Sequence, residues 1–172
     1  MLVLMAAVLT AVILLFGKPI LLMFGASDNT IGYAWDYMSI YAMGTIFVQI
    51  SLGLNAFINA QGYSLVGMCS VAIGAAANLL LDPLFIFVFG LGVQGAAVAT
   101  VLSQLLSASF VLLFLTKRAE LRVRFLRKAE FSQCIGYAKN IVSLGTSGFV
   151  MQLTNSLVTI CCNNVLSVTG GD

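Results

Sequence analysis

The chain is short of charged residues and contains no histidine. Only 8% of its 172 residues are Asp, Glu, Lys or Arg, whereas soluble domains carry about 25%. Hydrophobic residues make up 60% of the chain, and its mean hydropathy is +1.06. This composition excludes a soluble globular domain and predicts a membrane protein.

Cysteine is scarce too, and its spacing matches no metal-binding motif. Structural zinc sites combine closely spaced Cys and His ligands, and this chain has no histidine to offer. We therefore expect no metal centre and no cofactor, and we assign the cysteines to apolar packing. They are Cys69, Cys134, Cys161 and Cys162.

Five apolar runs are long enough to cross a bilayer, for which a helix needs roughly 20 residues. The ten-residue alternation of barrel strands is missing, and a helix satisfies its backbone hydrogen bonds internally in lipid. The expected fold is therefore all-α, a polytopic helical membrane protein with about five transmembrane helices. The runs cover residues 1–16, with an interfacial continuation to 24, then about 38–60, 64–89, 95–116 and 141–168.

Positive charge is concentrated in one segment. Six of the eight Lys and Arg residues lie between Lys117 and Lys128, directly after the fourth apolar run. Loops with such an excess normally stay in the cytoplasm, so we place loop 117–140 inside and expect a multi-pass protein of the cell (plasma) membrane. By alternation, loops 25–36 and 89–95 lie outside, and the first of these contains two aspartates.

The basic segment has two further interpretations. A nucleic-acid surface does not fit a chain this apolar, so no nucleic-acid partner is expected. Apolar residues between the charges suit a helix on the anionic inner leaflet, which makes membrane lipid an expected partner. These residues are Leu121, Phe125 and Leu126.

A single carboxylate, Asp82, stands within the third apolar run. A charge near the bilayer centre costs about 2.5 to 3.5 kcal/mol, so such an acid usually faces a bundle interior or a water-filled cavity. Asn78 precedes it by one turn on the same helical face, where its amide can meet the carboxylate. Pro83 removes a backbone donor and frees the carbonyl near residue 79. The sequence therefore predicts a polar site around Asp82.

Depth in the membrane adds Thr100 to this site. At about 1.5 Å per residue, Asp82 lies roughly 12 Å and Thr100 roughly 8 Å below the ends of the short turn that joins their helices. Gln104, one turn deeper, extends the polar strip, and Asn55 in the second run adds an amide. Such oxygen ligands suit a proton or a small hard cation such as Na⁺, and not zinc. The alternative is a structural anchor that hydrogen-bonds two helices.

At these residues the chain resembles the multidrug and toxic compound extrusion (MATE) family of secondary transporters. The resemblance rests on "GLNAFINAQGYS" followed by "AANLLLDPLFIFVFGLGVQGAAVATVLSQ". It covers the chain as an internal piece, under half of the usual family length. It implies that the five spans are the third to seventh helices of a two-lobe, twelve-helix transporter. Residues 1–116 would belong to the amino-terminal lobe, 117–140 would be the inter-lobe linker, and 141–172 would begin the carboxy-terminal lobe.

The family resemblance also implies a function. Similar transporters export small cationic or amphipathic substrates in exchange for H⁺ or Na⁺, and two lobes rock around a central cavity. The residues that match the family's cation site are Asp82, Asn78 and Thr100. Asn55 and Gln104 match positions that line the adjoining substrate cavity.

The last apolar run carries amides where some relatives have an acid early in the corresponding helix. Gln152 and Asn155 belong to this polar stripe, with Thr159 and Asn163 one and two turns further on. Two roles fit equally: a wall facing the substrate, or hydrogen bonding between helices. Because this stripe contains no carboxylate, we expect no ion coupling through it.

Three other functions compete with cation-coupled efflux. A flippase for lipid-linked oligosaccharide or polysaccharide, from the same superfamily, should hold pyrophosphate with basic residues inside its spans. An intramembrane aspartyl protease needs two facing carboxylates, and Asp82 stands alone, so we expect no enzyme. A non-transporting structural membrane protein would leave the height match of Asp82 and Thr100 as coincidence.

Overall fold

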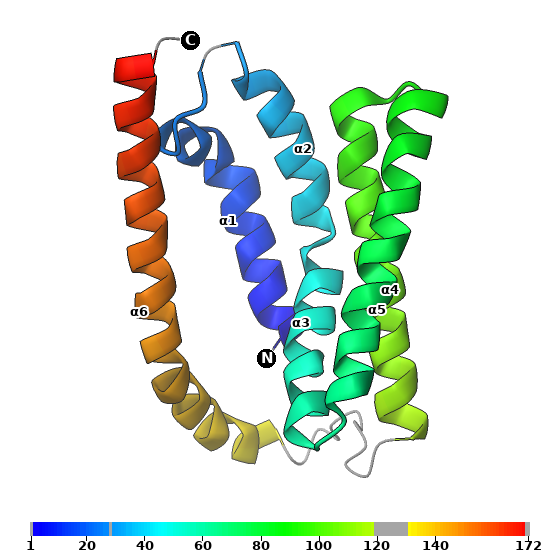
Figure 1. Cartoon of the computed structure of the whole chain (residues 1–172). Coiled ribbons are helices and arrows are strands. Elements are labelled where there is room, and N and C mark those ends of the chain that lie inside the picture. Colours follow the sequence, from blue (N-terminus) through cyan, green and yellow to red (C-terminus); the bar gives the residue numbers. More distant parts are fainter. Residues whose placement is uncertain (1, 28, 119–130, 171–172) are drawn as a thin grey trace. The chain divides into compact units, whose positions relative to one another are not determined.

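The computed structural model describes residues 2–27, 29–118 and 131–170. Every element within these ranges is a helix (Figure 1), which confirms the all-α prediction. The chain divides into two compact units, one formed by residues 1–18 with 32–123 and the other by 19–31 with 124–172. The helices are α1 (Leu2–Met23), α2 (Ile31–Met43), α3 (Thr45–Ala60), α4 (Ser64–Pro83), α5 (Gly92–Lys117) and α6 (Phe131–Gly170), and the π-helical turn η1 (Leu84–Val88) follows α4.

The described helices confirm the expected number of membrane spans. Four of them are long and apolar enough to cross a bilayer, and α2 with α3 makes a fifth if this bent pair forms one span. The helix α1 runs through Pro19 without a break, so residues 17–23 continue the first span and do not form a separate interfacial segment. Membrane helices tolerate proline where neighbouring groups or local helix adjustments satisfy the freed backbone carbonyl.

The second span is longer than predicted and is broken in the middle. It begins at Ile31, so Asp36 lies in α2 and not in the outer loop. The axes of α2 and α3 differ by 58° across Gly44. Gly44 is buried against α5, and a Cβ atom there would lie 2.9 Å from Val101 Cγ1 and even closer to Cγ2. The break therefore occurs where α5 passes too close for any side chain.

The third span ends in a widened turn. After Pro83, residues Leu84–Val88 adopt π-helical hydrogen bonding, as expected where a proline removes a donor from the ladder. Gly90 and Gly92 then reverse the chain with φ values of +65° and +54°, which suit glycine. The helix α5 starts at Gly92, three residues before the predicted position.

Small residues allow α3, α4 and α5 to pack closely. Ala97, Ala99, Ser103 and Ser107 are buried along α5, and small residues at membrane helix contacts permit close backbone approach. Figure 1 shows α4 and α5 running side by side over their length. A separate apolar cluster of Ile58, Val111 and Leu115 closes one end of this packing.

The predicted loop between residues 117 and 140 is shorter than expected on both sides. Lys117 is the last residue of α5, and α6 already begins at Phe131. Residues 119–128, which are most of the basic segment, lie outside the described residues, and so does the predicted lipid-facing set of Leu121, Phe125 and Leu126. In the second unit, Asn163 Nδ2 of α6 donates a 3.0 Å hydrogen bond to the Phe24 carbonyl oxygen.

Candidate functional site

The structure brings together the three residues expected around the buried acid. Asn78 Nδ2 donates to Asp82 Oδ1 at 3.1 Å and to Thr100 Oγ1 at 3.4 Å. All three side chains are half-buried. Asn78 therefore connects a carboxylate on its own helix to a hydroxyl on the neighbouring helix, and the cation-binding role of the three residues stays a prediction.

Local structure explains this arrangement. Asp82 follows Asn78 by four residues, so both project from one face of α4. The short turn after η1 brings α5 back antiparallel to α4, which sets Thr100 at the height of Asn78. The Thr100 hydroxyl donates to Ala96 O at 2.9 Å. Its oxygen is therefore available as an acceptor toward the Asn78 amide.

A fourth polar group comes from a helix that the sequence did not implicate. The Tyr37 hydroxyl on α2 lies 3.4 Å from Thr100 Oγ1. Because the Thr100 proton points to Ala96 O, Tyr37 is the donor in this pair. Tyr37 stacks on Tyr41 with ring centroids 6.0 Å apart. Its position just before the second predicted run, at about residue 38, gave no signal that it would reach Thr100.

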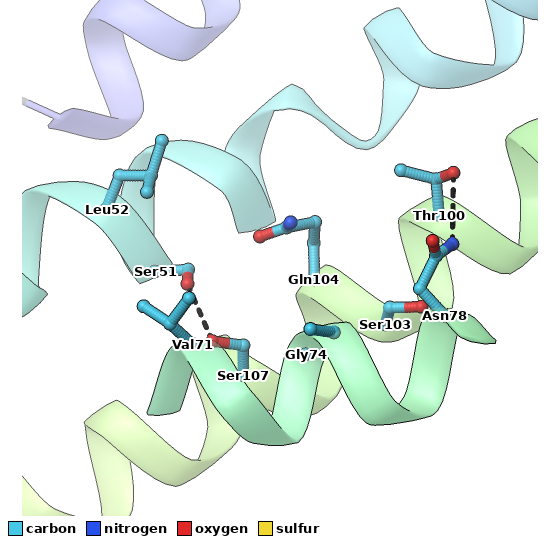
Figure 2. A pocket seen from close by; sticks show the side chains of 10 residues that line it. Ser51, Leu52, Val71, Gly74, Asn78, Thr100, Ser103, Gln104 and Ser107 are labelled. Carbon is cyan, nitrogen blue, oxygen red and sulfur yellow. Dashed lines mark hydrogen bonds between the residues drawn. The ribbon is translucent and has the colours of Figure 1, made fainter. Parts of the chain in front are cut away.

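Next to this cluster lies a cavity of about 210 Å³ between α3, α4 and α5. Figure 2 shows the Gln104 side chain extending into it, between the Ser51–Ser107 pair and the Asn78–Thr100 pair. Asp82 is not part of the cavity lining, but it is hydrogen-bonded to Asn78, which is. The residues that line it are Ser51, Leu52, Val71, Gly74, Ala75, Asn78, Thr100, Ser103, Gln104 and Ser107.

Serine pairs hold the cavity's far wall together. The Ser51 and Ser107 hydroxyl oxygens lie 2.8 Å apart across α3 and α5. Ser107 Oγ also donates to the Ser70 carbonyl oxygen of α4 at 2.9 Å. One hydroxyl therefore ties all three helices, and these serines were not among the predicted site residues.

The structure does not bring Asn55 to the cavity. Its side chain is buried between α3 and α4, where Nδ2 donates to Gly67 O at 3.1 Å and to Ser70 Oγ at 2.9 Å. A Cβ atom at Gly67 would clash with Asn55 Oδ1 at 2.6 Å, so Asn55 packs directly against the backbone of α4. Asn55 therefore links the two helices by hydrogen bonds, and its role at a substrate cavity stays a prediction.

Gln152 and Asn155 belong to the other compact unit. Both side chains are exposed on α6. The Thr159 hydroxyl on the same helix donates to the Asn155 carbonyl oxygen at 2.9 Å, which is ordinary satisfaction of a threonine in a helix. Their role as substrate-facing residues stays a prediction.

The cluster has the chemistry of a small-cation site. A carboxylate, a hydroxyl and an amide oxygen are ligands that hard cations prefer, and a carboxylate also accepts a proton. Which atom of the Asn78 amide faces Asp82 depends on a rotation about a single bond. The amide can therefore donate to the carboxylate in one orientation and offer its oxygen to a cation in the other.

The chain is similar to known multidrug export proteins. Residues 1–84 match the family model described as MatE. The chain is 26% identical over 145 residues to the multidrug export protein MepA of Staphylococcus haemolyticus (strain JCSC1435), covering 84% of this chain and 32% of the relative. It is 25% identical over 155 residues to MepA of Staphylococcus aureus (strain NCTC 8325 / PS 47), covering 90% of this chain and 34% of the relative.

A solved structure is similar over nearly the whole chain. It shows the inward-facing conformation of a multidrug resistance MATE family transporter of the MOP superfamily, with a TM-score of 0.82 and 25% sequence identity. The match covers 99% of this chain and 38% of that one. The chain thus spans about a third of the length of the curated relatives that it matches.

Proposed function

The chain belongs to the MATE family, and from that premise we propose that its helices work within a two-lobe transporter that exports small amphipathic or cationic compounds. We propose that H⁺ or Na⁺ moves in exchange. The observation that carries this proposal is the hydrogen-bonded group of Asp82, Asn78 and Thr100, half-buried inside the helix packing. A lone acid at such a position is a functional-site hypothesis by default.

Ion binding would change the contacts that Asn78 makes. With the carboxylate ionised, the Asn78 amide donates to Asp82. A Na⁺ between the oxygens would favour the rotated amide, and a proton on Asp82 would turn an acceptor into a donor. Either event weakens the present hydrogen bonds from Asn78 to Asp82 and Thr100. An ion drives alternating access only if it binds one arrangement better than the other.

Tyr37 extends this coupling to the bent second span. Its hydroxyl contacts Thr100, and its helix α2 meets α3 at the 58° bend. A change at Thr100 therefore reaches an element that is already broken at Gly44. We propose that ion binding changes the packing of the second span at this bend.

The cavity beside the cluster suits an ion and water better than a drug. Pockets for drug-sized ligands occupy about 300 to 1,000 Å³, and this one has about 210 Å³. We therefore assign it to the ion pathway, with Gln104 on its wall. The substrate contacts of Gln104, Gln152 and Asn155 belong to the same proposal, as parts of a larger cavity in the complete transporter.

The test compares two aspartates in the full-length transporter that carries these helices. Dye export is measured in vesicles with an imposed pH or Na⁺ gradient. We expect Asp82→Asn to abolish gradient-driven export. Asp36→Asn is the matched control, because Asp36 pairs with Gln94 at 3.1 Å at an exposed position, and it should export normally. Unchanged export by Asp82→Asn, with the protein correctly inserted, would reject the ion-site assignment.

A further inference from the structure

A second hollow lies at the opposite end of α5 from the ion cluster. It has a volume of about 450 Å³ and is lined by one residue of α4 and by the last turns of α5. From Thr100 to Lys117 the helix rises roughly 26 Å, so this groove is separate from the cavity beside Gln104. Its residues are Val66, Phe110, Leu113, Phe114, Lys117 and Arg118.

The groove is apolar along its length and basic at one end. Val66 and three residues of α5 supply the apolar wall, and Leu113 is 55% exposed. Lys117 and Arg118 stand together where α5 ends, and none of the six lining residues is acidic. From Phe110 to Arg118 the helix rises about 12 Å. A matching occupant therefore has an anionic head group for the basic end, joined directly to an apolar tail for the apolar wall.

The floor of the groove is fixed by the core beneath it. The Phe114 ring meets Tyr63 edge-on with centroids 5.4 Å apart. Phe114 also packs on the buried cluster that contains Val111 and Leu115. The Arg118 backbone N–H donates to Phe114 O at 2.8 Å, which holds the basic end against the last turn. The groove is thus a formed surface and needs little reorganisation to bind.

We propose that this groove binds one anionic phospholipid. Lys117 and Arg118 hold the phosphate as charge-assisted donors, and the acyl chain lies against Phe110, Leu113 and Val66. The concentration of basic residues predicts that this end of α5 faces the cytoplasmic leaflet, which is the anionic one. Because the Leu113 side chain is exposed, the tail can stay in the hydrocarbon while the head is bound.

Charge argues against the other candidate occupants. The residues that follow in the chain include four further bases, at positions 122, 124, 127 and 128, and like charges repel the pair at Lys117 and Arg118. A cationic export substrate is repelled in the same way. A phospholipid fits both parts of the groove, because its phosphate is opposite in charge to Lys117 and Arg118 and its acyl chain is apolar like the wall. The proposal concerns the membrane anchoring of this end of α5, and it stands whether or not the ion-coupled export proposed above is correct.

The experiment measures which lipids the purified 172-residue chain retains in native mass spectrometry. Dioleoyl-phosphatidylglycerol and dioleoyl-phosphatidylcholine are offered in equal amounts. We expect retention of one phosphatidylglycerol in preference to phosphatidylcholine, and loss of that preference in Lys117→Gln/Arg118→Gln. Each base near an anionic surface contributes about fivefold in affinity. Lys18→Gln, a lone base at the other end of unit 1, should keep the preference.

A second variant pair tests the apolar wall without touching the bases. Leu113→Glu places a carboxylate inside the groove and should lower phosphatidylglycerol retention, whereas Leu112→Glu, on the adjacent residue outside the lining, should not. Both leucines are exposed, and circular dichroism checks that each variant stays helical. Equal retention of the two lipids would overturn the proposal. So would an equal loss in Lys18→Gln, or displacement of the lipid by inorganic phosphate, which would indicate a site for a free anion.

Discussion

At the scale of single residues, Asn78 holds the candidate site together. Its amide reaches both Asp82 and Thr100, and such hydrogen bonds offset the cost of partly burying a carboxylate. Tyr37 on α2 joins the group by the contact of its hydroxyl with the Thr100 hydroxyl. The site is therefore a chain of hydrogen bonds over three helices, in which each member orients the next.

Tyr37→Phe tests that chain at its end. The variant keeps the ring and its stacking on Tyr41, and removes only the hydroxyl that contacts Thr100. A hydrogen bond of this kind contributes about 0.5–1.5 kcal/mol, so we expect a two- to tenfold loss of apparent ion affinity. The measurement is the Na⁺ or H⁺ concentration that gives half-maximal export. Tyr41→Phe is the control, and an equal loss in both variants would contradict the assignment.

At the scale of helices, close approach of backbones decides where spans bend. Gly44 separates α2 from α3 at the point where Val101 of α5 fills the space. Gly95 of α5 lies against η1, where a Cβ atom would come within 2.7 Å of the Phe85 carbonyl oxygen. Both glycines leave room for a neighbouring helix, so the bend and the π turn are parts of the packing around α5.

Gly44→Ala should destabilise the packing of the second span on α5. The added methyl group collides with the Val101 side chain, and overpacking of this kind costs about 1–3 kcal/mol. Gly44→Ala/Val101→Ala should recover most of that loss, because Val101 is the neighbour that gives way. Thermal unfolding of the purified chain in detergent measures the effect. A double variant no more stable than the single one would show that the cost lies elsewhere, in the backbone of the bend.

Gly32→Ala is the matched control for that experiment. Gly32 lies in the first turn of α2, and a Cβ atom there would meet nothing within 4 Å. Alanine favours helix over glycine by about 0.8–1.0 kcal/mol. The control variant should therefore unfold at the same temperature as the parent or slightly above it, while Gly44→Ala unfolds below it.

At the scale of the whole molecule, the protein exposes a surface that only a membrane or other helices can cover. Large apolar side chains such as Leu79 and Phe87 are 75% and 80% exposed. Such surface is a liability in water and is expected in lipid. With five spans and one basic segment, the chain also has a predicted direction in the bilayer.

That direction is tested by labelling two turns in a cysteine-free background. Asn29→Cys lies between α1 and α2 and Ser64→Cys at the start of α4, and both native residues are exposed. A membrane-impermeant maleimide should label Asn29→Cys in intact cells. Ser64→Cys should react only after permeabilisation. The reverse pattern would overturn the placement of loop 117–140 in the cytoplasm and, with it, the leaflet assigned to the lipid groove.

Much of the candidate site could be predicted because it is nearly local in sequence. Asn78 and Asp82 share a helical face by spacing alone, and a short turn sets Thr100 beside them at a height that the helical rise fixes. The contacts of Asn55 could not be predicted in this way because they depend on how α3 packs on α4, and its role at a substrate cavity stays a prediction. Asn55 is a polar residue in an apolar span, and its amide donates hydrogen bonds to Gly67 and Ser70 of α4.

By itself the sequence determined the membrane class, the five spans and the group around Asp82, because hydrophobic length and helical periodicity act over one helix or one hairpin. Only the tertiary structure decided that Tyr37 joins that group, that Ser51 and Ser107 close the cavity, and that the second span bends at Gly44. Each of these depends on which faces of distant helices meet. Side chains in lipid are apolar on nearly every face, so periodicity does not reveal that choice.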